Sequence, residues 1–166
     1  MNLKGLKKMF VKRLMIEEDL KAAFTIRKQV FVEEQSVPLE EEFDQFDTLH
    51  GLCEHILVHY NEQPVGTGRI RVVDGVGKLE RICLLKPFRK FGLGKVIINA
   101  LEEIAAEKGV LQVKLHGQTQ AEGFYKKLGY QTSSPIFMED GIPHILMVKE
   151  LSTREISQSE IGSLRS

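Results

Sequence analysis

A strand, a basic glycine-rich loop and a helix follow one another between residues 81 and 105, and this order constrains the fold most. Residues 81–85 form a short apolar run typical of a buried strand. The loop then reads Arg89-Lys90-Phe91-Gly92-Leu93-Gly94-Lys95. One helical face of the next segment is apolar and consists of Leu93, Val96, Ile97, Ala100, Leu101, Ile104 and Ala105. Because backbone N–H groups at a helix start are free and the helix dipole favours an anion there, the loop predicts a phosphate site.

Two familiar phosphate-binding motifs do not match this loop. A P-loop needs a glycine five residues before its Gly-Lys pair, where this chain has Arg89. It also needs a Ser or Thr directly after that pair, where this chain has Val96. A dinucleotide fingerprint that starts at Gly92 needs a third glycine where this chain has Ile97. A turn that only joins a strand to a helix is the simpler alternative, and the basic residues weigh against it.

The composition favours one globular domain. The chain has 166 residues, of which 42% are hydrophobic, so we expect a single domain over residues 1–151 and a serine-rich, mobile tail over 152–166. The 23 basic and 23 acidic residues balance, which argues against nucleic-acid or membrane partners. No apolar run has the length of a membrane span. Cys53 and Cys83 have no metal-ligand spacing and indicate reduced thiols in the cytoplasm, with no metal site.

Hydrophobic periodicity predicts a mixed α/β (α+β) domain with a largely antiparallel sheet. Strands are expected over residues 9–14, 55–60, 65–73, 78–85 and 111–115, and a closing hairpin over 137–139 and 145–149. Helices are expected from residue 17 to the break at 37–38, over 39–49, from the loop to 108, and around 121–128. Strand 111–115 follows a helical crossover and should run parallel to the strand before it.

Two motifs, in this order, resemble those of the GNAT acetyltransferases. Arg89-x-x-Gly92-x-Gly94 is similar to the loop that holds the pyrophosphate of acyl-CoA. Gln118-x-x-Ala121-x-x-Phe124-Tyr125-x-x-x-Gly129-Tyr130 is similar to the second motif, which usually has Asn in place of Gln118. Residues 30–38, 66–69 and 141–144 further resemble the bacterial ElaA/YjcF-like subgroup. The resemblance covers residues 9–150 and implies a mixed, mostly antiparallel sheet that splays between strands 4 and 5 and is flanked by helices.

The resemblance also implies a reaction: transfer of an acetyl group from acetyl-CoA to a primary amine by direct attack in a ternary complex. The cofactor-binding residues that it implies are Ile82, Cys83, Leu84, Arg89, Lys90, Phe91, Gly92, Leu93, Gly94, Lys95, Gln118 and Phe124. Tyr125 is the predicted general acid, because a phenol can protonate a leaving thiolate. A purely structural Tyr125 on a short amphipathic helix is the alternative. Cys83 has apolar neighbours and is expected to be structural, since they disfavour the thiolate that an acyl acceptor needs.

Three residues are candidates for the general base. Glu80 is the first choice, because superfamily members often place a glutamate that works through water on this strand. Glu34 matches the opening motif of the subgroup. His116 ends a strand that we expect to face the helix of Tyr125, and a histidine needs little tuning to act near neutral pH. Each has a structural alternative, as an exposed carboxylate or as a hydrogen-bonding group at a strand end.

An acidic run follows the first predicted helix and contains Glu40, Glu41, Glu42, Asp44 and Asp47. In this superfamily the segment borders the acceptor, so the run would suit a cationic small molecule or a lysine side chain. A solvated helix face is the commoner explanation. Two other functions stay open: a non-catalytic acyl-CoA-binding or regulatory module, and a protein that binds another phosphorylated nucleotide. A homodimer is also open, because the closing hairpin could extend the sheet of a second copy.

Overall fold

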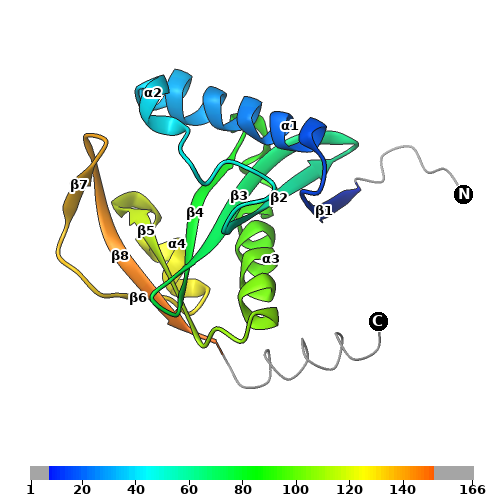
Figure 1. Cartoon of the computed structure of the whole chain (residues 1–166). Helices are drawn as coiled ribbons and strands as arrows, with labels where there is room; N and C mark the ends of the chain where they lie inside the picture. Colours follow the sequence, from blue (N-terminus) through cyan, green and yellow to red (C-terminus); the bar gives the residue numbers. More distant parts are fainter. Residues whose placement is uncertain (1–7, 152–166) are drawn as a thin grey trace, which may run out of the picture. The chain divides into compact units, whose positions relative to one another are not determined.

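The computed structural model describes residues 8–151 (Figure 1). These residues form two compact units. Unit 1 contains the residues up to Arg69 and Arg81–Ile97, and unit 2 contains Ile70–Glu80 and the residues from Ile98 onward. The single domain expected for residues 1–151 stays a prediction, and the tail expected at 152–166 lies outside the described residues. Within the part of the chain that the structure describes, no helix is long and apolar enough to cross a membrane.

Three elements contribute residues to both units: β3 (Gln63–Val73), β4 (Val76–Leu84) and α3 (Leu93–Glu107). In unit 1, β1 (Met9–Arg13) pairs antiparallel with β2 (Cys53–Tyr60), and hydrogen bonding continues in the order β2-β3-β4. The short turns between β2, β3 and β4 make these pairs antiparallel. The sequence analysis predicted all four of these strands.

A long helical segment completes unit 1. α1 (Glu17–Arg27) begins with three acidic residues, which suit the positive end of the helix dipole. It continues without a break into a π-helical turn, η1 (Lys28–Glu34), and the four-residue α2 (Leu39–Glu42) follows. The expected break at residues 37–38 therefore separates two helical segments.

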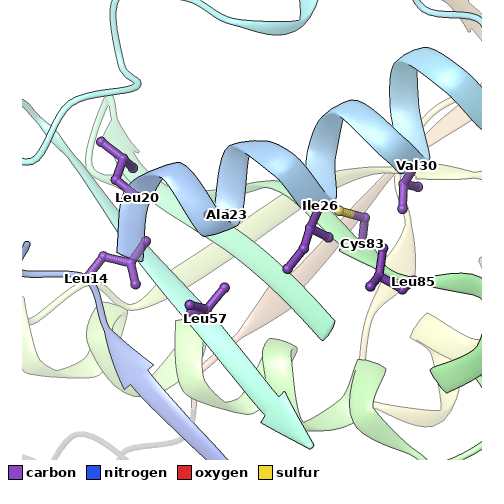
Figure 2. Close-up of a cluster of buried hydrophobic side chains, with 8 residues drawn as sticks. All are labelled: Leu14, Leu20, Ala23, Ile26, Val30, Leu57, Cys83 and Leu85. Atoms are coloured by element: carbon purple, nitrogen blue, oxygen red, sulfur yellow. The ribbon is translucent and has the colours of Figure 1, made fainter. Parts of the chain in front are cut away.

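The apolar side of α1 and η1 lies on a buried cluster in unit 1 (Figure 2). Its members come from the helical segment, β2, β4 and the adjoining loops: Leu14, Leu20, Ala23, Ile26, Val30, Leu57, Cys83 and Leu85. None is more than 9% exposed. Since burying a side chain the size of leucine or isoleucine stabilises a fold by roughly 1.5–3 kcal/mol, this cluster fixes the helix over the strand that leads to the glycine loop.

Unit 2 contains the parallel pair that the crossover predicts. Gly77–Leu79 of β4 pairs in parallel with Val113–Leu115 of β5 (Gln112–Gln118). The other edge of β5 pairs antiparallel with β8 (Ile142–Glu150). The elements between β5 and β8 are η3 (Thr119–Ala121), α4 (Glu122–Lys127), β6 (Gln131–Thr132) and β7 (Phe137–Glu139), and both short strands pair with β8. The predicted mixed α/β fold with a mostly antiparallel sheet is confirmed.

The structure differs from the sequence prediction in two elements. The helix expected over residues 39–49 has only the four residues of α2, because Phe43 is extended and the carboxylates that follow it turn toward arginines. The strand β6 was missed, because a strand of two residues is too short to show an alternation of apolar and polar positions. The parallel ladder between β4 and β5 joins only three residues of each strand, which agrees with strands that separate as the resemblance implies.

Candidate active site

The glycine loop of unit 1 leads directly into α3. A 3-10 turn, η2 (Lys86–Phe88), follows β4, and α3 begins at Leu93. Gly92 has φ +71°, and a Cβ added there would meet no atom within 4 Å. The backbone conformation, and not a lack of space, therefore requires glycine at this position. The first N–H groups of α3 have no partner within the helix and carry the positive end of its dipole.

Aromatic side chains anchor this loop to β2. The ring of Phe91 stacks on that of Tyr60, with centroids 4.7 Å apart and planes 6° apart. Phe88 meets the same tyrosine edge-on at 5.8 Å. Lys90 and Lys95 remain exposed on either side of the glycines. The loop thus combines a fixed backbone with accessible positive charge.

Arg89 is held at the base of the loop by two groups. Its Nε donates to the carbonyl oxygen of Leu84 at 3.0 Å, and its Nη1 lies 2.7 Å from Glu34 Oε2. The hydrogen bond and the charge of Arg89 lower the pKa of Glu34, although burial opposes this. A carboxylate held in this way is a poor proton acceptor, so these contacts disfavour Glu34 as the general base.

Strand β4 has an unusual backbone immediately before the residues expected to contact the cofactor. Arg81 has φ +56°, which is strained for a residue with a side chain and is a feature that clusters at functional sites. Its Nη2 donates to the carbonyl oxygen of Glu42 at 3.1 Å, and its Nε lies 3.0 Å from Glu42 Oε2. Burial raises the pKa of the Cys83 thiol, which supports a structural role for Cys83.

The acidic run is neutralised inside unit 1 by an arginine cluster, whose members are Arg27, Arg69, Arg81, Glu42, Asp44 and Asp47. Arg27 contacts Glu42 Oε2 at 2.9 Å and Asp47 Oδ1 at 2.6 Å. Arg69 contacts Asp44 Oδ2 at 2.9 Å and Asp47 Oδ1 at 2.8 Å. Arg27 and Arg69 are each only 1% exposed, so the ion pairs shield these charges from water.

Both interpretations of the acidic run are wrong for Glu42, Asp44 and Asp47. These three carboxylates neither form a solvated helix face nor offer free charge to a cationic acceptor, because three arginines balance them. Only Glu40 and Glu41 of the run are exposed. Burial opposes the ionisation of Asp47, but the hydrogen bond and charge of Arg27, the amide of Asp44 and the charge of Arg69 lower its pKa to about 2.

In unit 2, Tyr125 lies against the backbone of β5. A Cβ built on Gly117 would be 3.0 Å from Tyr125 Cε2, so a larger residue there would require the ring to move by a few tenths of an ångström. The ring also contacts those of Phe124 and Tyr130, at centroid distances of 5.2 and 5.9 Å. Burial raises the pKa of Tyr125 to about 12, and the phenol therefore keeps its proton at neutral pH. Gln118 on the same strand accepts a hydrogen bond from Gln120 at 2.5 Å.

His116 lies on the opposite face of β5 from Tyr125. Buried and partly exposed residues alternate along β5, and the buried set includes Gly117, against which Tyr125 packs. His116 therefore points to the other face of β5, although the strand itself faces the helix of Tyr125 as expected. The register pairs Lys78 of β4 with Lys114 of β5, so Glu80 and His116, each two residues further on, share one face.

The contacts of Glu80 and His116 on this face differ. Arg71 Nε donates to Glu80 Oε1 at 2.9 Å, and Lys78 Nζ lies 3.1 Å from Glu80 Oε2. His116 Nδ1 lies 2.9 Å from Glu139 Oε1. The hydrogen bond and charge of His116 lower the pKa of Glu139. Sequence reasoning missed Glu139, because its position depends on the pairing of β7 with β8 and of β8 with β5.

The side chains that commonly bind metals do not gather into a metal site in the described part of the chain. Within residues 8–151, no three His, Cys, Asp or Glu side chains are arranged to hold a metal ion.

Comparisons with known proteins identify the family. Residues 17–151 match the family model described as an acetyltransferase (GNAT) domain. YjcF of Bacillus subtilis, named an uncharacterized N-acetyltransferase, is 52% identical over 81% of this chain and 94% of its own length. The crystal structure of Escherichia coli ElaA superposes with a TM-score of 0.76 at 27% identity, over 86% of this chain and 100% of that one.

A more distant structure shares the fold. It is the PaiA N-acetyltransferase of Thermoplasma acidophilum, solved in complex with coenzyme A, with a TM-score of 0.67 and 18% identity over 87% of this chain and 99% of that one. The resemblance to the ElaA/YjcF-like subgroup is confirmed by YjcF and ElaA. The chain therefore belongs to the GNAT acetyltransferase family and is an N-acetyltransferase enzyme of that type.

Proposed function

We propose that this enzyme transfers an acetyl group from acetyl-CoA to a primary amine by direct attack in a ternary complex. The observation that carries the proposal is the start of α3, where Gly92 at φ +71° precedes free helical N–H groups. The exposed lysines beside it add positive charge suited to a pyrophosphate. The coenzyme A bound to PaiA supports the same class of donor.

In this proposal, the cofactor contacts are those that the resemblance implies. Residues 89–95 hold the pyrophosphate, and backbone groups of Ile82, Cys83 and Leu84 contact the pantetheine arm and the thioester oxygen. The strained backbone of Arg81, immediately before these groups, supports this role of β4, because such strain clusters at functional sites. Gln118 and Phe124 contact the arm, and the 40% exposure of Phe124 leaves its ring accessible for such a contact.

The chemistry follows from the groups that the proposal assigns. The amine lone pair attacks the thioester carbonyl carbon, a C–N bond forms, and the C–S bond then breaks. Tyr125 donates its proton to the leaving thiolate, and the raised pKa of Tyr125 keeps the phenol protonated at neutral pH, as this role requires. Glu80 or His116 takes the proton that the amine nitrogen loses. Cys83 takes no covalent part.

The acceptor is a small amine or a lysine side chain. The two cysteines are free and buried, which supports a reducing compartment such as the cytoplasm. A homodimer formed through the closing hairpin of β7 and β8 stays a prediction, and size-exclusion chromatography with light scattering tests it.

A thiol-release assay tests the proposal. The protein is incubated with acetyl-CoA and a panel of small amines and lysine peptides, and free CoA is measured with and without enzyme. We expect enzyme-dependent CoA release with at least one amine class. If acetyl-CoA raises the melting temperature but no amine releases CoA, the protein is a binding or regulatory module. If ATP or NAD stabilises it more than CoA does, the loop serves another nucleotide.

A further inference from the structure

We propose, on the basis of the proposed acetyl transfer, that His116 is the general base and that Glu139 orients it. His116 would take the proton from the acceptor nitrogen directly, as a catalytic residue. Glu139 would act through His116, as a positioning residue. The proposal rests on the contacts of the two side chains and on the sheet face that they share with Glu80.

The hydrogen bond between the two residues fixes which imidazole nitrogen can accept a proton. His116 Nδ1 lies 2.9 Å from Glu139 Oε1, and an ionised carboxylate has no proton to donate. Nδ1 therefore carries the proton and donates it in this bond. In a neutral imidazole the other nitrogen then has the free lone pair, so Nε2 is the basic atom. The carboxylate also stabilises the imidazolium that forms when Nε2 takes a proton.

The surroundings of the ring hold it in place and leave it accessible. Phe137 of β7 meets the imidazole edge-on, with ring centroids 5.0 Å apart. The His116 side chain is nevertheless 30% exposed. A ring that is fixed at Nδ1 and on one edge, but is still open to solvent, can be reached by an amine.

Glu80 is a poorer base on the same face. One of its carboxylate oxygens accepts from Arg71 at 2.9 Å, and the other lies 3.1 Å from Lys78. Its side chain is only 10% exposed. A proton that moves to Glu80 would have to replace the interaction of one carboxylate oxygen with Arg71 or Lys78. Nε2 of His116, in contrast, carries a lone pair on an accessible ring.

Charged and titratable groups lie on the strands that neighbour His116. They are Lys78 and Glu80 on β4, Lys114 on β5, Glu139 on β7 and His144 on β8. His144 Nδ1 donates to the carbonyl oxygen of Ile142 at 2.7 Å, and its Nε2 lies 3.6 Å from Glu139 Oε2. A second histidine thus borders the same carboxylate, and the pH dependence of His116 has to be measured against a His144 variant.

The step balances without any further reactant. The amine nitrogen forms the C–N bond and gives one proton to His116 Nε2. The electron pair of the C–S bond leaves with sulfur, which takes the proton of Tyr125. His116 then releases its proton to water and Tyr125 regains one. The net reaction converts acetyl-CoA and an amine into the acetylated amine and CoA.

The experiment compares His116→Ala, His116→Gln and Glu139→Gln with the wild type, using the amine that gives turnover. Glu80→Gln and His144→Gln are measured alongside, and His50→Gln, at an exposed bend, is the matched control. For each variant kcat/KM is measured from acidic to basic pH, and the melting temperature shows that the protein is folded. His116→Ala is also assayed with added imidazole, which can occupy the vacated space.

We expect both His116 variants to lose about 10²–10⁴-fold in kcat/KM and to lose the acidic limb of the pH profile. Imidazole restores part of the activity of His116→Ala. Glu139→Gln retains more activity than the His116 variants, and it lowers kcat more than it changes the KM for the amine, because the imidazolium has lost its carboxylate partner. His144→Gln and His50→Gln keep the limb.

The proposal is overturned if folded His116 variants keep wild-type kcat/KM, or if they keep the acidic limb and gain nothing from imidazole. If Glu80→Gln loses the acidic limb of the pH profile while His116→Ala keeps it, the general base is Glu80 instead. A wild-type protein that acetylates no amine overturns the proposed function itself, and that result is distinct from turnover that does not depend on His116.

Discussion

At the residue scale, the phenol of Tyr125 still holds the proton that an acid needs at neutral pH, because burial raises its pKa to about 12. We expect Tyr125→Phe to lower kcat by about 10²-fold or more, with the KM for acetyl-CoA little changed. Thiol release measures both constants. Tyr130→Phe is the control, since this phenol donates to Glu102 at 2.8 Å and its loss should lower the melting temperature instead. Undiminished kcat in Tyr125→Phe would assign the ring a packing role.

Gly92 and Gly75 allow the role of the glycine loop to be separated from backbone strain. Both have positive φ, +71° and +78°, and a Cβ at either would meet no atom within 4 Å. Alanine at each should therefore cost a similar ~1–2 kcal/mol of stability. We expect only Gly92→Ala to raise the KM for acetyl-CoA, because Gly75 lies in the turn between β3 and β4. Equal KM values in the two variants would remove Gly92 from the cofactor site.

At the element scale, the absence of a side chain at residue 117 leaves room for the Tyr125 ring of α4 against β5. A Cβ there would lie 3.0 Å from Tyr125 Cε2, so Gly117→Ala should displace the ring and reduce kcat. Gly123→Ala, on α4 itself, is the control, because a Cβ there meets nothing within 4 Å and alanine favours a helix. A crystal structure of Gly117→Ala with an unmoved Tyr125 and normal turnover would contradict this expectation.

The arginine cluster determines how α1 and the segment after α2 are held in unit 1. Arg27→Met leaves Glu42 and Asp47 buried without this partner, and we expect it to lower the free energy of unfolding by about 3–5 kcal/mol. Urea denaturation measures the loss. Lys28→Met, at the next and exposed position, should change the free energy by less than ~0.5 kcal/mol. Equal stability of the two variants would show that the buried pairs contribute little.

Sequence patterns predicted some elements and missed others for physical reasons. The strands alternate clearly, and the helix after the glycine loop has a continuous apolar face, so local periodicity was sufficient. The segment 39–49 was misjudged because the acids that suggested an exposed helix pair with Arg69 and Arg81, which are remote in sequence. The face on which His116 lies could not be predicted from the sequence, because the neighbouring Gly117, which has no side chain, forms the contact with Tyr125.

At the scale of the whole molecule, the cluster makes stability depend on pH in the acidic range. The folded pKa of Asp47 is about 2, below its ordinary value of 3.8, so its contribution is complete above that ordinary value and disappears as the pH falls through about 2. This contribution is about 2 kcal/mol. The pKa of Asp44 is also lowered by Arg69 against the effect of burial, whereas burial raises that of Glu42, which partly offsets the loss.

Urea denaturation at pH values from neutral to about 2.5 tests this dependence. We expect the free energy of unfolding to fall as the pH decreases below about 4. Asp47→Asn should flatten the slope, while Asp74→Asn, in a turn between strands, should leave it unchanged. A wild-type slope in Asp47→Asn would show that other carboxylates determine acid stability.

The family and the fold class could be predicted from the sequence, because the glycine loop and the second motif are local in the chain. The cofactor-binding residues, Tyr125 and Glu80 stay predictions. The partners of the side chains depend on contacts across the sheet. Glu139 became a candidate only through the pairing of β7 with β8 and of β8 with β5, which no short motif encodes.

The arginine cluster also has a consequence for how this chain can change in evolution. Its three cations and three anions come from α1, β3, β4 and the segment that begins at α2. A substitution that removes one charge leaves an opposite charge buried, so it is tolerated best when a second substitution removes that charge as well. Among homologues, we therefore expect loss of Arg69 to accompany loss of Asp44 or Asp47, although these positions are more than twenty residues apart.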